Sequence, residues 1–282
     1  MVVIPLLLAP LLMAVATVLE RRIGPAVAGW VGAAPVIIVI ALFAVSADLG
    51  PGAAALLAGG AAEHVVAQVA YASSFALLVR RLGTVAGLSA GVGAFVLVSL
   101  VLALLPQGRI PAAAAVAAGV VALLAGRWLP TVPRPLGPRT APRSGPDDSA
   151  CDPDARGGHR VGPVIAVRGA VALVAVGVVV TVAHLAGPGA AGLVSAFPTF
   201  STALALLVAR DLGTPGVAAV LTGTVRALPS YLVFCVTVWL AAPAMGIGAA
   251  VALGLTACLA TSRLVLPGRG ASAVAQLVRP DR

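Results

Sequence analysis

The chain has 282 residues, of which 60% are apolar and 10% charged, with a net charge of +9 and a mean hydropathy of +1.09. A soluble domain carries charge on about a quarter of its residues, so this composition excludes an ordinary water-soluble fold and predicts a chain solvated by lipid. The positive charge comes from arginines that lie mostly between apolar runs, which indicates membrane topology and not nucleic-acid binding.

Nine apolar segments approach or exceed the roughly 20 residues that a helix needs to cross the hydrocarbon core of a bilayer. The predicted spans are 2–19, 26–46, 52–79, 84–105, 110–126, 169–186, 189–209, 216–242 and 244–264. The first lacks a basic leader and a cleavage site, so we expect it to be retained. The fifth is short and Ala-rich, and a re-entrant or interfacial piece is its alternative. We therefore expect an all-α, multi-pass membrane protein with about nine transmembrane helices.

The distribution of arginines orients these spans. With nine spans, an outside N-terminus and a cytoplasmic C-terminus, nearly all arginines fall on the cytoplasmic side, which is the positive-inside pattern of a bacterial plasma (inner) membrane. Arg109 falls outside and Arg226 lies within a span. Without the fifth span, Arg210 and Arg263 would face outward, so the charge pattern favours keeping it. The stretch from Thr131 to Pro163 has no apolar periodicity and predicts a disordered cytoplasmic linker.

The two halves of the chain match each other at an offset of 163 residues. The matching segments are 24–35 with 187–198, 48–50 with 211–213 and, after a one-residue insertion, 52–59 with 216–223. Each half holds four spans, and the fifth span between them reverses the second half, which predicts two four-helix repeats of inverted topology. The predicted units are repeat 1 (1–105), a linking helix (106–129), the linker (130–163), repeat 2 (164–266) and a cytoplasmic tail (267–282).

The residues around the first turn resemble a known family. Val18-Leu19-Glu20 at the end of the first span, a short basic turn and the Gly-rich entry from Gly29 to Pro35 resemble the GlpM-like family of small bacterial inner-membrane proteins. Those proteins have about four helices, and their biochemical role is not established. The resemblance covers both halves and implies two such units fused in tandem. The second copy has His184 and no glutamate near the end of its first span, so any role of Glu20 is not duplicated.

Three ionisable side chains lie inside predicted spans. Glu63 and His64 fall in the third span and Arg226 in the eighth, where the repeat alignment places it opposite Ala62. A charge at the centre of a lipid-facing helix costs about 3 kcal/mol, so such residues usually face an interior and find partners. Glu63 is either a proton-accepting or substrate-exchanging carboxylate, with Arg226 as counter-charge or anion anchor, or half of a structural ion pair. His64 points about 100° away from Glu63, which favours a packed histidine over a relay.

Prolines and aspartates mark matching places in the two halves. Pro35 and Pro198 lie in the middle of spans, where a proline kinks or breaks a helix, and they serve either packing or an interrupted helix along a substrate path. Thr199 follows Pro198 and is a candidate lining residue of that path. Asp48 and Asp211 occupy matching helix ends, where we expect helix capping, with a gate as the alternative.

No sequence motif indicates an enzyme, a metal centre or a cofactor site, and Cys151, Cys235 and Cys258 have no metal-ligand spacing. The inverted repeat favours a secondary transporter or permease for a small or lipid-linked substrate, with an anionic substrate and proton coupling as options. A non-transporting membrane subunit or scaffold is the alternative, and a membrane enzyme acting on lipid carriers is a distant third. The expected partners are membrane lipid and the unidentified substrate, not nucleic acid, and a homodimer stays open.

Overall fold

The computed structural model describes residues 35–104, 119–121, 124–125 and 161–265 of the chain. Within these residues every element is a helix and no strand occurs. The helices are α3 (Val36–Leu49), α4 (Pro51–Glu63), α5 (Val65–Ala103), α7 (Val161–Leu185), α8 (Pro188–Ala196) and α9 (Thr199–Val265). The predicted spans 2–19 and 110–126, the linker 130–163 and the tail 267–282 lie wholly or mostly outside the described residues.

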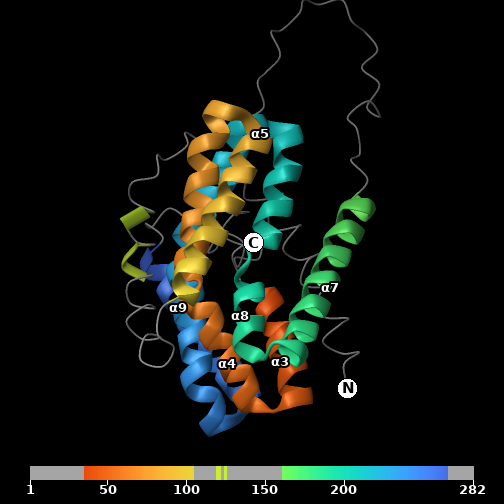
Figure 1. Cartoon of the computed structure of the whole chain (residues 1–282), viewed down its shortest axis with the longest axis vertical. Coiled ribbons are helices and arrows are strands. Elements are labelled where there is room, and N and C mark those ends of the chain that lie inside the picture. The colour runs from red at the N-terminus through yellow and green to blue at the C-terminus, as the bar shows by residue number, and fades with distance from the viewer. Residues whose placement is uncertain (1–34, 105–118, 122–123, 126–160, 266–282) are drawn as a thin grey trace, which may run out of the picture.

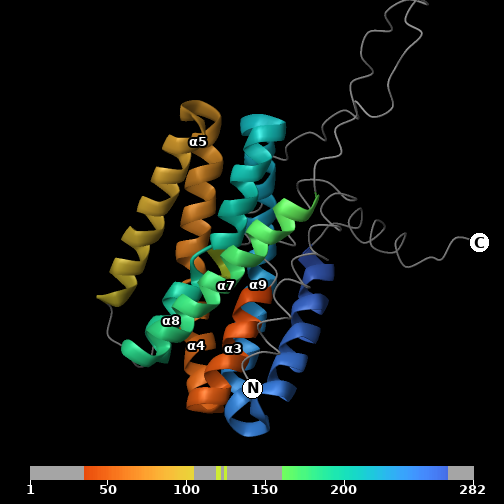
Figure 2. The same cartoon turned by 90° about the vertical axis from the view of Figure 1, so that its right-hand side faces the viewer.

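The two longest helices are each broken by glycines in a left-handed conformation. A straight helix of the 67 residues of α9 would be about 100 Å long, about three times the thickness of a hydrocarbon core. Instead α5 is interrupted at Gly83 (φ 86°) and α9 at Gly213 (φ 63°) and Gly246 (φ 79°). Only glycine adopts this conformation readily. The chain therefore folds back at these points, as the turn at the upper end of α5 shows (Figure 2).

The helical segments alternate in direction along one long axis (Figures 1 and 2). α3 runs to the lower end, and α4 with the first part of α5 runs back to the upper end. The second part of α5 descends again. In the second half, α7 descends, α8 and the first part of α9 ascend, the middle part of α9 descends, and its last part ascends. The result is an up-and-down bundle in which elements far apart in sequence lie side by side.

The centre of the bundle is built on close packing of α4 against α8. Gly60 and Gly192 meet there with their backbones almost in contact, since a Cβ added at Gly192 would lie 2.6 Å from the carbonyl oxygen of Leu57. Next to them, the ring of Trp239 covers Gly59. Small residues allow such approach between helices in lipid, where apolar side chains gain little from mutual burial. The close packing predicted for Gly192 is confirmed, and its partner is α4.

By length and composition, three stretches of the described chain are suited to cross a membrane. They are Pro51–Ala103, Pro188–Arg210 and Leu212–Leu264, and Ile37–Leu49 and Leu173–Leu185 are shorter apolar helices. The first and third stretches contain the left-handed glycines, so each holds more than one crossing length. Many large apolar side chains on the outside are exposed, which suits a surface in contact with lipid.

The structure corrects three predicted boundaries. α7 begins at Val161, eight residues before the predicted span 169–186, so the last residues of the predicted linker are helical. The early start is possible because Pro163 lies in the first helical turn, where a proline is tolerated. The predicted span 52–79 is divided at His64, between α4 and α5. The predicted span 189–209 is divided between α8 and α9.

Candidate functional site

The break between α8 and α9 is the most irregular backbone in the middle of the bundle. Phe197 is extended (ψ 126°), and its N–H donates to the carbonyl of Val194 at 3.2 Å. Pro198 has no N–H, and the N–H of Thr199 donates to the carbonyl of Phe197 at 2.7 Å. The carbonyl of Ser195 therefore loses its usual helical partner, the N–H four residues later. The helix break predicted at Pro198 is confirmed, and it exposes polar backbone beside apolar side chains.

A buried hydrogen bond ties this break to α5. The hydroxyl of Thr202 donates to the carbonyl of Pro198 at 2.7 Å, and its Oγ1 lies 2.6 Å from the hydroxyl of Tyr71. Because the proton of Thr202 is used by Pro198, the hydroxyl of Tyr71 is the donor to Thr202. Tyr71 is fully buried. This bond joins the two halves of the chain across 131 residues.

Aromatic rings surround the same point. The ring of Phe197 lies edge-on to Phe95 at 5.2 Å between centroids and to Tyr71 at 5.9 Å. Tyr71 and Phe95 come from the first and second parts of α5, so Phe197 contacts both arms of that helical hairpin. Edge-to-face pairs are worth about 0.5–1.5 kcal/mol each beyond the area they bury. The break is thus held by a rigid aromatic cluster, although its backbone is irregular.

A cavity of about 830 Å³ opens beside the break, between the second part of α5, α7 and α8. Its lining carries no charged residue, and its polar side chains are Ser99, Ser195 and Thr199. The hydroxyl of Ser195 donates to Gly192, whereas the hydroxyl of Ser99 is buried and has no hydrogen-bond partner in the part of the chain that the structure describes. The site is therefore an apolar pocket with one unsatisfied polar group and an interrupted helix at its edge.

Glu63 and Arg226 are both half-buried, but the ion pair predicted between them is not formed within the described residues. Each lies 13 residues after the glycine that starts its segment, Gly50 or Gly213. The two segments run in opposite directions, so each side chain is about 20 Å from a different end of a segment about 50 Å long. Their depths therefore differ by roughly 10 Å. Arg226 makes another contact, so it is not a free charge.

His64 is a buried residue at the junction of α4 and α5. Its Nδ1 lies 2.8 Å from the carbonyl oxygen of Gly60, one helical turn earlier. Pro35, the other proline of the predicted path, is also buried and precedes the first residue of α3. Both residues lie where a helix begins or ends, and neither lines the cavity beside Pro198.

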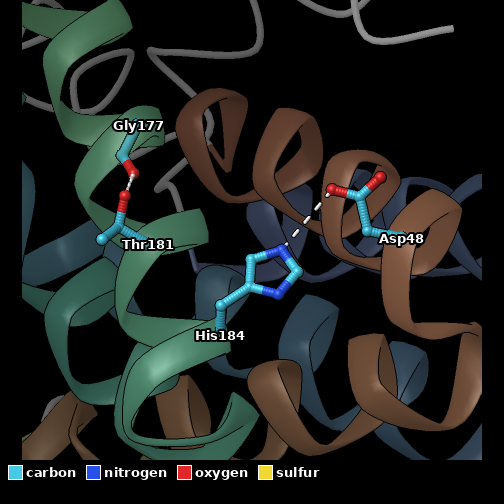
Figure 3. A network of polar contacts seen from close by, with 4 residues as sticks. All are labelled: Asp48, Gly177, Thr181 and His184. Atoms are coloured by element: carbon cyan, nitrogen blue, oxygen red, sulfur yellow. Dashed lines mark hydrogen bonds and ion pairs between the residues drawn. The ribbon is translucent and has the colours of Figure 1, made fainter.

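Asp48 does not cap α4, contrary to the prediction. The N-cap of α4 is Gly50, with no side-chain hydrogen bond, because Asp48 is still inside α3. Its Oδ2 instead lies 3.7 Å from Nε2 of His184 at the end of α7 (Figure 3), an ion pair when the histidine is protonated. Both side chains are substantially exposed. The side chain of Asp211 lies outside the described residues.

Tyr71, Phe95, Phe197 and Ser99 build the site together with the residues after Pro198, and none of these four was singled out from the sequence. Buried aromatic and small residues are common in every helical core, so nothing in the pattern separates these from the rest. A proline followed by three hydroxyl residues was the one signal that pointed to this place.

Comparison of the chain with protein families, with curated proteins and with solved structures finds no match. The resemblance to two fused GlpM-like units therefore stays a prediction. The argument for function rests on the arrangement of the helices and on the site beside Pro198.

Proposed function

We propose that this chain is a secondary transporter or permease of the bacterial inner membrane, built from two four-helix repeats of opposite orientation and about nine spans. The observation that carries the proposal is that segments equivalent by the 163-residue offset run in opposite directions through the bundle (Figure 2). Inverted repeats are a common architecture of secondary transporters, because they create a central site that can open to either side.

The left-handed glycines support this repeat independently of the Ala-rich sequence. Gly50 and Gly213 are 163 residues apart, and so are Gly83 and Gly246. These four glycines divide the chain at equivalent places, and α3 aligns with the first 14 residues of α9 at the same offset. With the offset equal at both turns, Arg226 corresponds to Glu63 and not to its neighbour.

Charged residues at the helix ends follow the same rule. The offset of 163 aligns Asp48 with Asp211 and His184 with Arg21. Each half therefore carries an aspartate at one helix end and a basic residue at another, although Arg21 lies outside the described residues. The contact between Asp48 and His184 makes this correspondence more than a coincidence of composition.

The break at Pro198 and its cavity support transport over a static scaffold. Broken helices beside a cavity are the usual place of transporter binding sites, because free backbone groups are tolerated there and can contact a substrate. The apolar lining favours a lipid-linked substrate, or one with a substantial apolar part, over a small anion. In this proposal Glu63 carries the coupled proton.

The orientation is tested with two matched cysteines. Leu49 and Leu212 are repeat equivalents with similar exposure, 42% and 46%. In a background with Cys151→Ser, Cys235→Ala and Cys258→Ala, we expect a membrane-impermeant thiol reagent to label one of Leu49→Cys and Leu212→Cys from outside intact cells. The other should react only in inverted vesicles. Labelling of both from the same side would refute the inverted repeat and leave the scaffold reading ahead.

Alternating access is tested without knowledge of the substrate. In the same cysteine-free background, we expect Thr199→Cys to react with the impermeant reagent from both sides of the membrane, because the break would face each side in turn. A static scaffold exposes this position to one side at most. Adding Glu63→Gln should make the ratio of the two reaction rates independent of an imposed pH gradient, and a ratio that still follows the gradient would remove Glu63 from the coupling.

A further inference from the structure

The cavity beside Pro198 has an exposed apolar rim and a buried floor. On the rim, Val96 of α5 is 57% exposed and Val174 of α7 is 65% exposed. On the floor, Phe95, Ser99 and Val179 are nearly or fully buried. Since the rim consists of the sides of two apolar helices, the cavity communicates with the surface that would face lipid. An opening onto water would instead be ringed by polar groups.

Hydrocarbon gains little by moving from lipid into this cavity, because both environments are equally apolar. Selective occupancy therefore depends on a polar contact, and Ser99 provides one. Its hydroxyl is buried, has no partner in the described part of the chain and belongs to the cavity lining. A buried hydroxyl without a partner is unfavourable, so a ligand that brings a hydrogen-bond acceptor satisfies a group that the protein leaves open.

We propose that the cavity is the entry site of a lipid-type substrate, an amphiphile whose hydrocarbon chain slides in from the bilayer between α7 and the second part of α5. The chain contacts the apolar walls, and an ester or amide carbonyl of the amphiphile accepts a hydrogen bond from Ser99. The interrupted backbone after Phe197 lies at the inner edge of the site, where the polar part would pass. This inference rests on the proposed transport function and names the class of its substrate.

The experiment uses the full-length protein in phosphatidylglycerol–phosphatidylethanolamine vesicles. The probe is a long-chain fatty acid methyl ester with a diazirine in the middle of its chain, and its partner probe is the corresponding alkane. After irradiation, labelled residues are located by mass spectrometry. We expect labelling by the ester to concentrate on 95–103 and 170–179, the two segments that form the rim and floor.

Two pairs of variants separate a site from ordinary lipid contact. Val174→Trp fills the rim and should lower labelling of both segments about five-fold or more, whereas Leu240→Trp, at a residue also 65% exposed but outside the cavity, should not. Ser99→Ala should lower labelling by the ester about three- to ten-fold, the worth of one hydrogen bond, and leave labelling by the alkane unchanged. Ser230→Ala is the control, because that hydroxyl is also buried without a partner among the described residues but lies outside the cavity.

Labelling that spreads evenly over all exposed apolar residues, or that falls equally in Val174→Trp and Leu240→Trp, would overturn the entry site. If this occurs while the cysteines at Leu49 and Leu212 react from opposite sides, the substrate class is wrong and the transporter proposal stands. If labelling follows the expected pattern while those cysteines react from the same side, the cavity binds lipid in a protein that does not transport, which overturns its role as an entry site.

Discussion

Replacing Gly192 by alanine tests whether the two halves are held together by backbone contact between α8 and α4. A Cβ at this position would lie 2.6 Å from the carbonyl oxygen of Leu57 and 2.8 Å from the backbone nitrogen of Ala61. These are backbone atoms of a packed helix, so they cannot turn aside as a flexible side chain would. α8 must move away from α4 by roughly 0.8 Å to restore ordinary van der Waals contact.

The expected loss follows from two opposing effects. Overpacking of this kind costs about 1–3 kcal/mol, and the better helix propensity of alanine returns up to about 1 kcal/mol. Gly192→Ala should therefore lower the free energy of unfolding by about 1 kcal/mol. Gly189→Ala, in the same helix, has no atom within 4 Å of the new Cβ and should gain the propensity term alone.

Thermal unfolding in detergent micelles measures the difference between these two variants. A gap of about 2 kcal/mol corresponds to melting temperatures roughly 4–8 °C apart, with Gly192→Ala the lower. Equal melting temperatures for Gly192→Ala and Gly189→Ala would show that α4 and α8 do not approach as closely as the structure has them, and would refute the reasoning.

Three further predictions concern the turn glycines, the hydrogen bond at the break and the helix-end ion pair. Gly83→Ala and Gly246→Ala should each lower stability by about 1–2 kcal/mol in thermal unfolding, because both force an L-residue into left-handed backbone; a loss at only one would argue against equivalent turns. Tyr71→Phe should lose about 1 kcal/mol through the bond to Thr202, and an undiminished loss when Thr202 is valine would contradict that assignment. Asp48→Asn should change the melting temperature by less than 2 °C, because an exposed ion pair contributes about 0.2–1 kcal/mol; a larger change would assign it a structural role.

Helix boundaries were predicted well wherever a single residue type decides the backbone. Prolines and glycines end or break helices through their own geometry, so the predicted gaps near 80–84, 210–215 and 242–244 contain or adjoin the left-handed glycines. The division at His64 was missed, because no proline or left-handed glycine marks it. There the helix adjusts over one residue (φ −87°, ψ 5°), and only the packing of its neighbours decides this.

The candidate site was predicted in part. Pro198 and Thr199 mark it through a local rule, whereas Tyr71, Phe95 and Ser99 belong to it only because α5 folds back at Gly83 and lies against the start of α9. The predicted pair of Glu63 and Arg226 failed for the same kind of reason. Counting residues places both deep in a span, but their separation depends on the direction in which each helix runs.

The sequence by itself determined the helical class, the apolar surface and the places where helices stop, because these follow from composition and from the geometry of proline and glycine. The tertiary structure decided which helices touch, where a polar group is left without a partner and where a cavity remains. Those properties depend on contacts between residues more than a hundred positions apart, such as Tyr71 with Thr202. A local pattern cannot encode them, since the same buried serine or aromatic ring is part of the core in one packing arrangement and lines a site in another.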